Sequence, residues 1–224
     1  MGQFGIQPLY ATPVYTELFD PTSNLDLMQD EIDLAITTTE FNLPGEHKFS
    51  DQLGHGICRG EFDGDWLQEK ACVSFITSLN GAIERYCKYI GFPSSASYFK
   101  DKDNLNYDRT SWINKFQKGS YAHIHSHSTT DISGVYYYKA EPDSGSIFFE
   151  SPVSQASCTD AWVQLTNRFA IPPKPGLLVL FPGWLWHGVS TNFTDHERIS
   201  ISWNIIFSWY VWIVHLCRRN CTRF

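Results

Sequence analysis

The stretch Tyr121-Ala-His-Ile-His-Ser-His-Ser-Thr-Thr-Asp-Ile-Ser-Gly-Val-Tyr-Tyr-Tyr138 decides the fold, and it carries histidines at every second position from His123 to His127. Alternate side chains of an extended strand point to one face, and neutral imidazole is the commonest metal ligand in proteins. Any two of these imidazoles could therefore meet one metal ion at the rim of a strand. A polar strand end that binds no metal is the alternative explanation of the same pattern.

A second stretch makes metal binding the stronger interpretation. An apolar strand is expected at Leu177–Phe181, and the lone histidine His187 follows among aromatic residues. Arg198 and Ser200 then alternate on one face of the next expected strand. A planar guanidinium binds a carboxylate through two parallel hydrogen bonds. The pattern thus places a metal beside a carboxylate-binding arginine.

These residues resemble those of the iron(II)- and 2-oxoglutarate-dependent oxygenases, and in particular a branch found in bacteria and marine phages. The resemblance covers roughly residues 9–207. The matching motifs are His125-Ser-His127, Ser133-Gly-Val-Tyr-Tyr137, Gly145-Ser-Ile-Phe-Phe-Glu-Ser-Pro152, Pro175 to Pro182, His187 and Glu197 to Asn204. Any one of them would be weak evidence, whereas the combination is specific. The resemblance implies a double-stranded β-helix (jelly roll), and an enzyme that couples decarboxylation of 2-oxoglutarate to hydroxylation of an unknown substrate with Fe(II) and O2.

The resemblance also implies roles for individual residues. Arg198 is expected to pair with the distal carboxylate of 2-oxoglutarate, with Ser200 as an added donor and Tyr137 as a further cosubstrate contact. Asn114 faces either the site or a structural hydrogen-bond partner. The competing explanation of Arg198 is a surface ion pair with a neighbouring acidic residue, Glu197 or Asp195.

The identity of the third iron ligand stays open at this stage. In the usual motif of non-haem iron oxygenases a carboxylate completes two histidines, and in this chain the corresponding position holds His127. Three arrangements follow: a triad of His125, His127 and His187, a carboxylate supplied by Asp131, or a near pair made by His123 and His125. The spacing to Ser133-Gly134 in the branch favours the first.

Length and composition limit the class of protein. The 224 residues, with 42% hydrophobic and 16% aromatic side chains, suit one oxygenase domain spanning 1–224 with a mainly β core. A net charge of −7 argues against general nucleic-acid binding. The six scattered cysteines predict reduced thiols and a cytoplasmic location. No transmembrane span is expected, and a homodimer is compatible with the sequence.

The domain is expected to divide into three parts. Residues 1–106 supply helical and loop support. They include a strand at 8–19 that Pro13 interrupts and confines to an edge or a bulge, and a helix from Asp65 to Ile90 that begins with a capping box of Asp65 and Gln68. Residues 41–64 are predicted to be a loop. The jelly-roll core spans 107–207, with a turn at Lys118-Gly119. The tail 208–224, apolar and then basic, departs from the family pattern.

Two other functions compete with this prediction. One is a cupin-like metal dioxygenase that uses three histidines without 2-oxoglutarate. The other is a non-catalytic jelly-roll binding module, against which the presence of His125, His187 and Arg198 argues. The weakly patterned segment 153–167 is predicted to act as a lid or a substrate loop.

Overall fold

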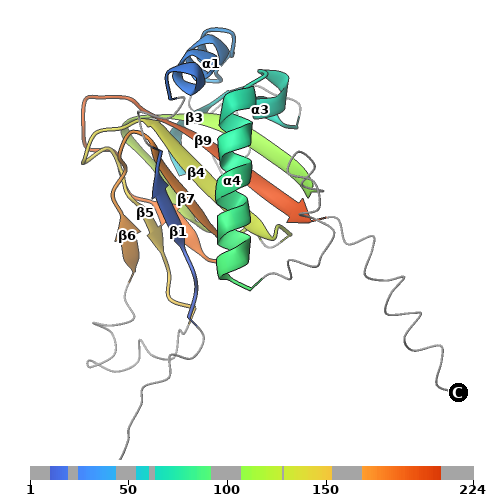
Figure 1. Ribbon diagram of the computed structural model, residues 1–224. Helices are drawn as coiled ribbons and strands as arrows, with labels where there is room; N and C mark the ends of the chain where they lie inside the picture. Colours follow the sequence, from blue (N-terminus) through green and yellow to red (C-terminus); the bar gives the residue numbers. More distant parts are fainter. Residues whose placement is uncertain are drawn as a thin grey trace, which may run out of the picture.

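The computed structural model describes residues 11–19, 25–43, 54–60, 64–91, 107–127, 129–152 and 168–207. Their strands form one curled nine-stranded sheet in the order β1-β7-β4-β9-β3-β8-β5-β6, with β2 paired to β3, and every paired strand is antiparallel to its neighbour. The strands are β1 (Tyr15–Leu18), β2 (Gly54–Arg59), β3 (Tyr107–His125), β4 (Ile132–Lys139), β5 (Ile147–Phe149), β6 (Phe169–Ile171), β7 (Leu177–Pro182), β8 (His187–Val189) and β9 (Arg198–Phe207). Figure 1 shows the curled sheet with the helices outside it. The predicted jelly roll with flanking N-terminal helices is confirmed.

The helices are α1 (Leu25–Thr37), α3 (Trp66–Glu69) and α4 (Val73–Tyr89). Helix α4 lies across one face of the sheet (Figure 1), where its apolar stripe meets the apolar side of β9. The fully buried members of this core include Phe75, Leu79, Ile83, Ile201, Trp203 and Ile205. The predicted stripe is therefore core. Burial of side chains of this size contributes roughly 1.5–3 kcal/mol each.

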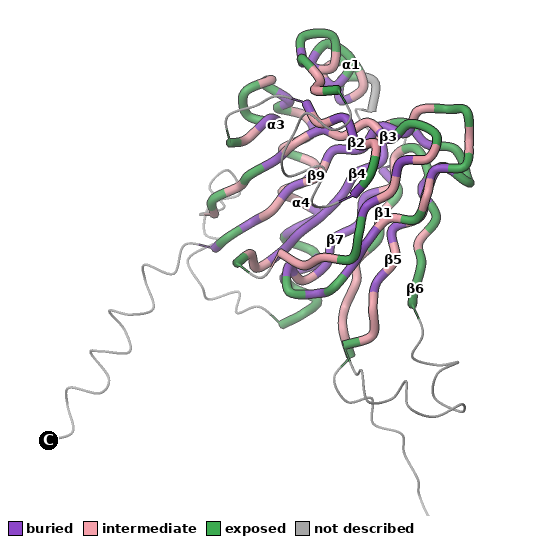
Figure 2. Tube along the Cα trace, turned by 180° about the vertical axis from the view of Figure 1, so that it is seen from behind, coloured by how far each residue is buried: buried purple, intermediate pink, exposed green. Residues whose placement is uncertain are grey.

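Strand β9 separates this core from a cavity by alternation of its side chains, although Trp203 belongs to the core and also lines the cavity. Its even-numbered positions Arg198, Ser200 and Ser202 line the cavity, while the odd-numbered positions carry apolar side chains that belong to the core. Figure 2 shows that much of the central strands is buried. One strand thus supplies both the packing that fixes the sheet and the polar groups of the site.

The predicted single helix from Asp65 to Ile90 is wrong. The helix is broken between α3 and α4, where Ala71 adopts the left-handed conformation with φ 55°. Asp65 makes no side-chain cap, so the capping box is wrong too. Its carboxylate instead accepts hydrogen bonds from Arg109 and Ser111 on β3. The Asp65 carboxylate therefore pairs with the buried guanidinium of Arg109 and does not cap the helix.

A side chain from another helix caps α4. The carboxylate of Glu31 on α1 accepts hydrogen bonds from the backbone N–H groups of Ser74, at 2.9 and 3.0 Å, and of Phe75, at 3.4 Å. The first N–H groups of a helix have no partner within the helix, and negative charge is stabilising at that end. Glu31 therefore ties α1 to α4.

Two expectations about loops and turns also need correction. The segment 41–64, predicted as a loop, contains β2, which pairs with β3 through a bulge at Gly56. Gly54 permits close approach, since a Cβ there would lie 2.1 Å from the backbone oxygen of Tyr121. Lys118-Gly119 does not end a strand: β3 continues through it, with Gly119 at φ 86°.

Other expectations can be compared only where the structure describes the chain. Strand β1 begins after Pro13 and lies at the end of the strand order, so the predicted edge position is confirmed. The predicted lid 153–167 and the tail 208–224 lie outside the described residues. Within the described part of the chain, no helix is long and apolar enough to cross a membrane.

Candidate active site

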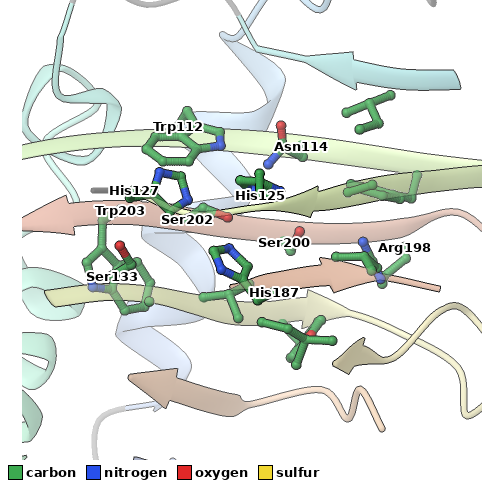
Figure 3. A pocket seen from close by; sticks show the side chains of 18 of the residues that line it. Trp112, Asn114, His125, His127, Ser133, His187, Arg198, Ser200, Ser202 and Trp203 are labelled. Atoms are coloured by element: carbon green, nitrogen blue, oxygen red, sulfur yellow. The ribbon is translucent and has the colours of Figure 1, made fainter. Parts of the chain in front are cut away.

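Three histidines from different parts of the chain meet at one end of the cavity (Figure 3). His125 ends β3, His127 follows it, and His187 begins β8. Each offers a ring nitrogen, and the three nitrogens lie within 4.8 Å of one another. The ring centroids are 4.4 Å apart for His125 and His187, 5.1 Å for His125 and His127, and 5.2 Å for His127 and His187. This spacing suits three ligands of a single ion.

The hydrogen bonds of two imidazoles fix the nitrogen that faces the centre. Nδ1 of His125 lies 2.8 Å from the backbone oxygen of His123, and Nδ1 of His187 lies 2.9 Å from that of Leu185. A carbonyl oxygen can only accept, so both Nδ1 atoms carry the proton. Nε2 of each ring therefore keeps its lone pair for a metal. Hydrogen bonds of this kind orient metal-binding histidines in general.

Burial keeps the three rings uncharged. It lowers the pKa of His187 to about 3, aided by the positive charge that His125 would carry, and it lowers the pKa of His127 to about 4. The pKa of His125 is also lowered by burial. At neutral pH all three imidazoles are therefore in the form that binds metal.

The other histidine and the aspartate considered as ligands lie elsewhere. A register shift between Ala122 and His125 in the β3–β8 pairing acts as a bulge. As a result His123 is exposed, with its ring against Tyr121, while His125 points into the cavity. The carboxylate of Asp131 accepts a hydrogen bond from the backbone N–H of Phe207. Neither residue belongs to the histidine cluster in the described chain.

Arg198 lies in the same cavity, away from His127 (Figure 3). Its side chain is 1% exposed, so the predicted alternative of a surface ion pair is wrong. Asp195 instead pairs with Lys118 on the surface. Nη1 of Arg198 donates to the backbone oxygens of Gly145, at 2.6 Å, and Ser144, at 3.4 Å.

The guanidinium of Arg198 is incompletely satisfied. Its Nε is buried without a hydrogen-bond partner, and no carboxylate of the described residues pairs with it. Its flat face lies on Phe116, with Cζ 3.9 Å from the ring centroid. Burial lowers the pKa of Arg198 to about 10, well above neutral, so the group stays charged. A buried cation of this kind needs an anion.

The three remaining predicted residues form one row across the sheet. Ser200 on β9 is directly opposite Asn114 of β3 on one side and Tyr137 of β4 on the other. All three line the cavity, next to Arg198. Tyr137 is 1% exposed, and burial raises its pKa, so the phenol keeps its proton. The row offers an amide and two hydroxyls between the arginine and the histidines.

Several cavity residues were missed by sequence reasoning. Ser202 continues the alternation of Arg198 and Ser200, so that alternation was a usable signal. Arg59 and Trp112 also line the wall, with Cζ of Arg59 4.9 Å from the indole centroid. Arg59 lies in a segment predicted as a loop, and no sequence signal pointed to it.

The cavity, of about 110 Å³, fits a metal ion with a small dicarboxylate. Three neutral imidazoles suit iron(II) among other divalent metals. The unsatisfied Nε of Arg198 and the polar row beside it suit a carboxylate. Chemistry and shape therefore agree with iron(II) and 2-oxoglutarate as bound groups.

Comparisons with known proteins agree with this geometry. The model of the family described as "Putative 2OG-Fe(II) oxygenase" matches residues 110–204. Among curated protein sequences, none matches. A prolyl-4-hydroxylase from Pseudomonas putida is similar in structure, with a TM-score of 0.58 and 15% identity over 89% of this chain and 95% of that one.

Two further solved structures are similar at low identity. The non-heme alpha ketoglutarate dependent carbocyclase SnoK from nogalamycin biosynthesis has a TM-score of 0.55 at 12% identity, covering 92% of this chain and 86% of its own. HygX from Streptomyces hygroscopicus, with nickel, 2-oxoglutarate and hygromycin B bound, has a TM-score of 0.55 at 9% identity, covering 88% and 84%. These likenesses concern the fold, and the family match concerns the sequence. The family model thus matches the part of the chain that carries the three histidines and Arg198, and the solved structures share its fold.

Proposed function

We propose that His125, His127 and His187 bind iron(II), and that Arg198 binds the distal carboxylate of 2-oxoglutarate. Ser200, Tyr137 and Asn114 complete the cosubstrate site, and the enzyme hydroxylates a substrate still to be identified. The site is thus a three-histidine version of the usual arrangement of two histidines and one carboxylate.

The observation that carries this proposal is the buried charge of Arg198. In the described residues its guanidinium bonds only to neutral carbonyl oxygens, and its Nε bonds to nothing. Leaving a cation buried without a counter-charge is costly, and the cost disappears when a carboxylate arrives. The cavity that holds this cation also holds the three imidazoles.

Each residue has a defined task. Bound iron would activate O2, the oxidant, while 2-oxoglutarate would be oxidised to succinate and CO2. The histidines hold the metal as neutral ligands, so the site keeps one more positive charge than a site with a carboxylate ligand. That extra charge favours a dianionic cosubstrate. Tyr137, whose phenol stays protonated, donates a hydrogen bond toward bound cosubstrate, and the apolar wall beside Phe116 excludes water and strengthens the ion pair.

The test is succinate formation from 2-oxoglutarate by the full chain with iron(II), with and without candidate substrates. Wild type should release succinate, and His187→Ala should not. Arg198→Ala should need at least about tenfold more 2-oxoglutarate, because losing one partner of a buried pair costs roughly 2–5 kcal/mol.

One different outcome would favour the competing enzyme. The absence of a carboxylate among the three clustered ligands is also what a cupin-like dioxygenase would have. If the iron-loaded protein consumed oxygen on a substrate without 2-oxoglutarate, and Arg198→Ala had no effect, that assignment would replace ours.

We further propose that the enzyme works in a reducing compartment such as the cytoplasm. Cys58, Cys72 and Cys87 are buried free thiols. Burial raises the pKa of Cys72 and of Cys87 to about 12, which keeps them unreactive. The net charge of −7 argues against general binding of nucleic acids by this protein.

A homodimer stays a prediction, and measuring the mass of the protein in solution would test it.

A further inference from the structure

A ring of four polar contacts begins and ends on His127. Nδ1 of His127 lies 3.3 Å from Nδ2 of Asn204, and Oδ1 of Asn204 lies 2.8 Å from Oγ of Ser133. Oγ of Ser133 lies 3.2 Å from Oγ1 of Thr130, which in turn donates to the backbone oxygen of His127 at 2.9 Å. Nδ1 of His125 and of His187 each contacts a backbone carbonyl oxygen. Among the described residues, Nδ1 of His127 contacts the side-chain amide of Asn204 instead.

Counting protons shows that the orientation of the Asn204 amide matters. With Nδ2 toward His127, the amide donates to Nδ1, and the hydroxyls of Ser133 and Thr130 donate to Oδ1 and to the His127 oxygen. No proton then remains for a hydrogen bond between the hydroxyls of Ser133 and Thr130. The proton of a neutral His127 would moreover sit on Nε2, where it blocks a metal.

The reversed amide satisfies every contact. Rotation by 180° exchanges Nδ2 and Oδ1 and leaves the four distances unchanged. His127 Nδ1–H then donates to Asn204 Oδ1, Asn204 Nδ2 donates to Ser133, Ser133 donates to Thr130, and Thr130 donates to the His127 carbonyl. All four contacts now hold one proton each, and Nε2 of His127 has a free lone pair.

We propose that Asn204 is a positioning residue for the third metal ligand: through the ring with Ser133 and Thr130 it holds His127 in the Nδ1–H tautomer that turns Nε2 toward the metal. The inference rests on the proposed function, because it needs His127 as a ligand. It explains how a histidine serves where relatives of the usual pattern carry a carboxylate, which has no tautomer to fix.

The backbone around the ring supports this role. Ser133 and Asn204 are directly opposite each other on β4 and β9, so the sheet itself sets their separation. Gly183 packs against the turn that carries Thr130, since a Cβ there would lie 2.2 Å from Thr130 Oγ1 and 2.9 Å from the His127 oxygen. The backbone oxygen of Gly183 also accepts a hydrogen bond from the backbone N–H of His127, at 2.8 Å. The ring is thus held by two strands, β4 and β9, and by the turn that carries Thr130.

The first measurement needs no variant. In the full chain, labelled with 15N-histidine, nitrogen chemical shifts report which ring nitrogen of His127 carries the proton. We expect Nδ1–H in the metal-free protein, and Nδ1–H with Nε2 bound in the Zn(II)-loaded protein. A His127 protonated on Nε2 in both forms would overturn the proposal.

The second measurement is Co(II) affinity of metal-free protein, followed by the visible absorption of the bound ion. Asn204→Leu keeps the size but not the hydrogen bonds, and should weaken binding by about 10–100-fold, as outer-shell partners of metal ligands typically do. Asn204→Asp keeps an acceptor for Nδ1–H and should restore at least wild-type affinity. Thr110→Val is the matched control, because Thr110 is the exposed neighbour of Asn204 on β3 and lies outside the ring.

The outcomes separate the two proposals. If His127→Ala binds Co(II) as wild type does, His127 is not a ligand and the proposed triad fails. If His127→Ala loses affinity while a folded Asn204→Leu does not, the triad stands and only the ring is wrong. Should Asn204→Leu fail to fold, Ser133→Ala serves instead, with a loss in the same direction expected.

Discussion

His125 and His187 are directly opposite each other in the β3–β8 ladder, with ring centroids 4.4 Å apart. Cross-strand neighbours of this kind are held by the sheet, and each ring is also held by a carbonyl at Nδ1. Removal of either ring should leave two ligands on one side of the metal.

We therefore expect His187→Ala to abolish measurable iron(II) or Co(II) binding at micromolar protein while the fold is retained. Calorimetric titration of metal-free protein checks it. The controls are His123→Ala and Asp131→Asn, which should bind metal as wild type does, because one side chain is exposed and the other bonds to the backbone of Phe207. Loss of metal in Asp131→Asn alone would restore a carboxylate to the ligand set.

Arg198 should control cosubstrate affinity without affecting the metal. Arg198→Ala is expected to raise the 2-oxoglutarate concentration needed for half-maximal succinate release by at least about tenfold, since the cosubstrate carboxylate would lose a desolvated partner. Co(II) affinity without 2-oxoglutarate should be unchanged. Lys118→Ala is the matched cation control, because its ion pair with Asp195 is exposed and contributes little. Equal effects of both substitutions would refute a special role for Arg198.

Gly134 should tolerate no side chain. A Cβ there would lie 2.5 Å from Cζ2 of Trp203 and 2.8 Å from Cδ2 of Leu180, so Gly134→Ala overpacks the core and should cost about 1–3 kcal/mol. Gly81→Ala, in the middle of α4, meets only the flexible end of Arg85 at 3.3 Å and should stabilise by about 0.5–1 kcal/mol. Urea denaturation measures both, and a destabilised Gly81→Ala would contradict the helix assignment.

The carboxylate of Glu31 should contribute to the stability of α4. Glu31→Gln keeps the size but loses the charge at the helix N-terminus, and Glu31→Ala loses the hydrogen bonds to Ser74 and Phe75 as well. We expect a loss of about 0.5–2 kcal/mol for the alanine variant, as for other N-terminal caps, and less for glutamine. Asp30→Ala, exposed on the same helix, should change the free energy of unfolding by no more than about 0.5 kcal/mol.

Sequence patterns predicted most of the core of this fold because the physics behind them is local. The apolar stripe of α4 and the alternation on β9 each follow from the geometry of one element. The pairing of Arg198 with Ser200 on one face is likewise a property of a single strand. These predictions held in the structure, whereas the roles of the two residues stay predictions.

Where two elements compete for one residue, the sequence was misleading. Asp65 has the pattern of a helix cap, but Arg109 and Ser111 on a distant strand bind its carboxylate. The helix it was expected to begin breaks at Ala71, and α4 receives its cap from Glu31 of another helix. Such choices depend on which groups the fold brings together.

The sequence by itself determined a histidine-rich strand, a distant histidine and an arginine that shares a strand face with a serine, because alternation follows from strand geometry. The jelly roll and the oxygenase chemistry were implied by the resemblance of these motifs to the 2-oxoglutarate-dependent oxygenases. Only the tertiary structure decided which imidazoles converge. Simple alternation groups His123 with His125, whereas the bulge before His125 turns His123 outward. The position of Asn204 beside His127 likewise depends on the register between β4 and β9, and register is set by long-range pairing that no single segment encodes.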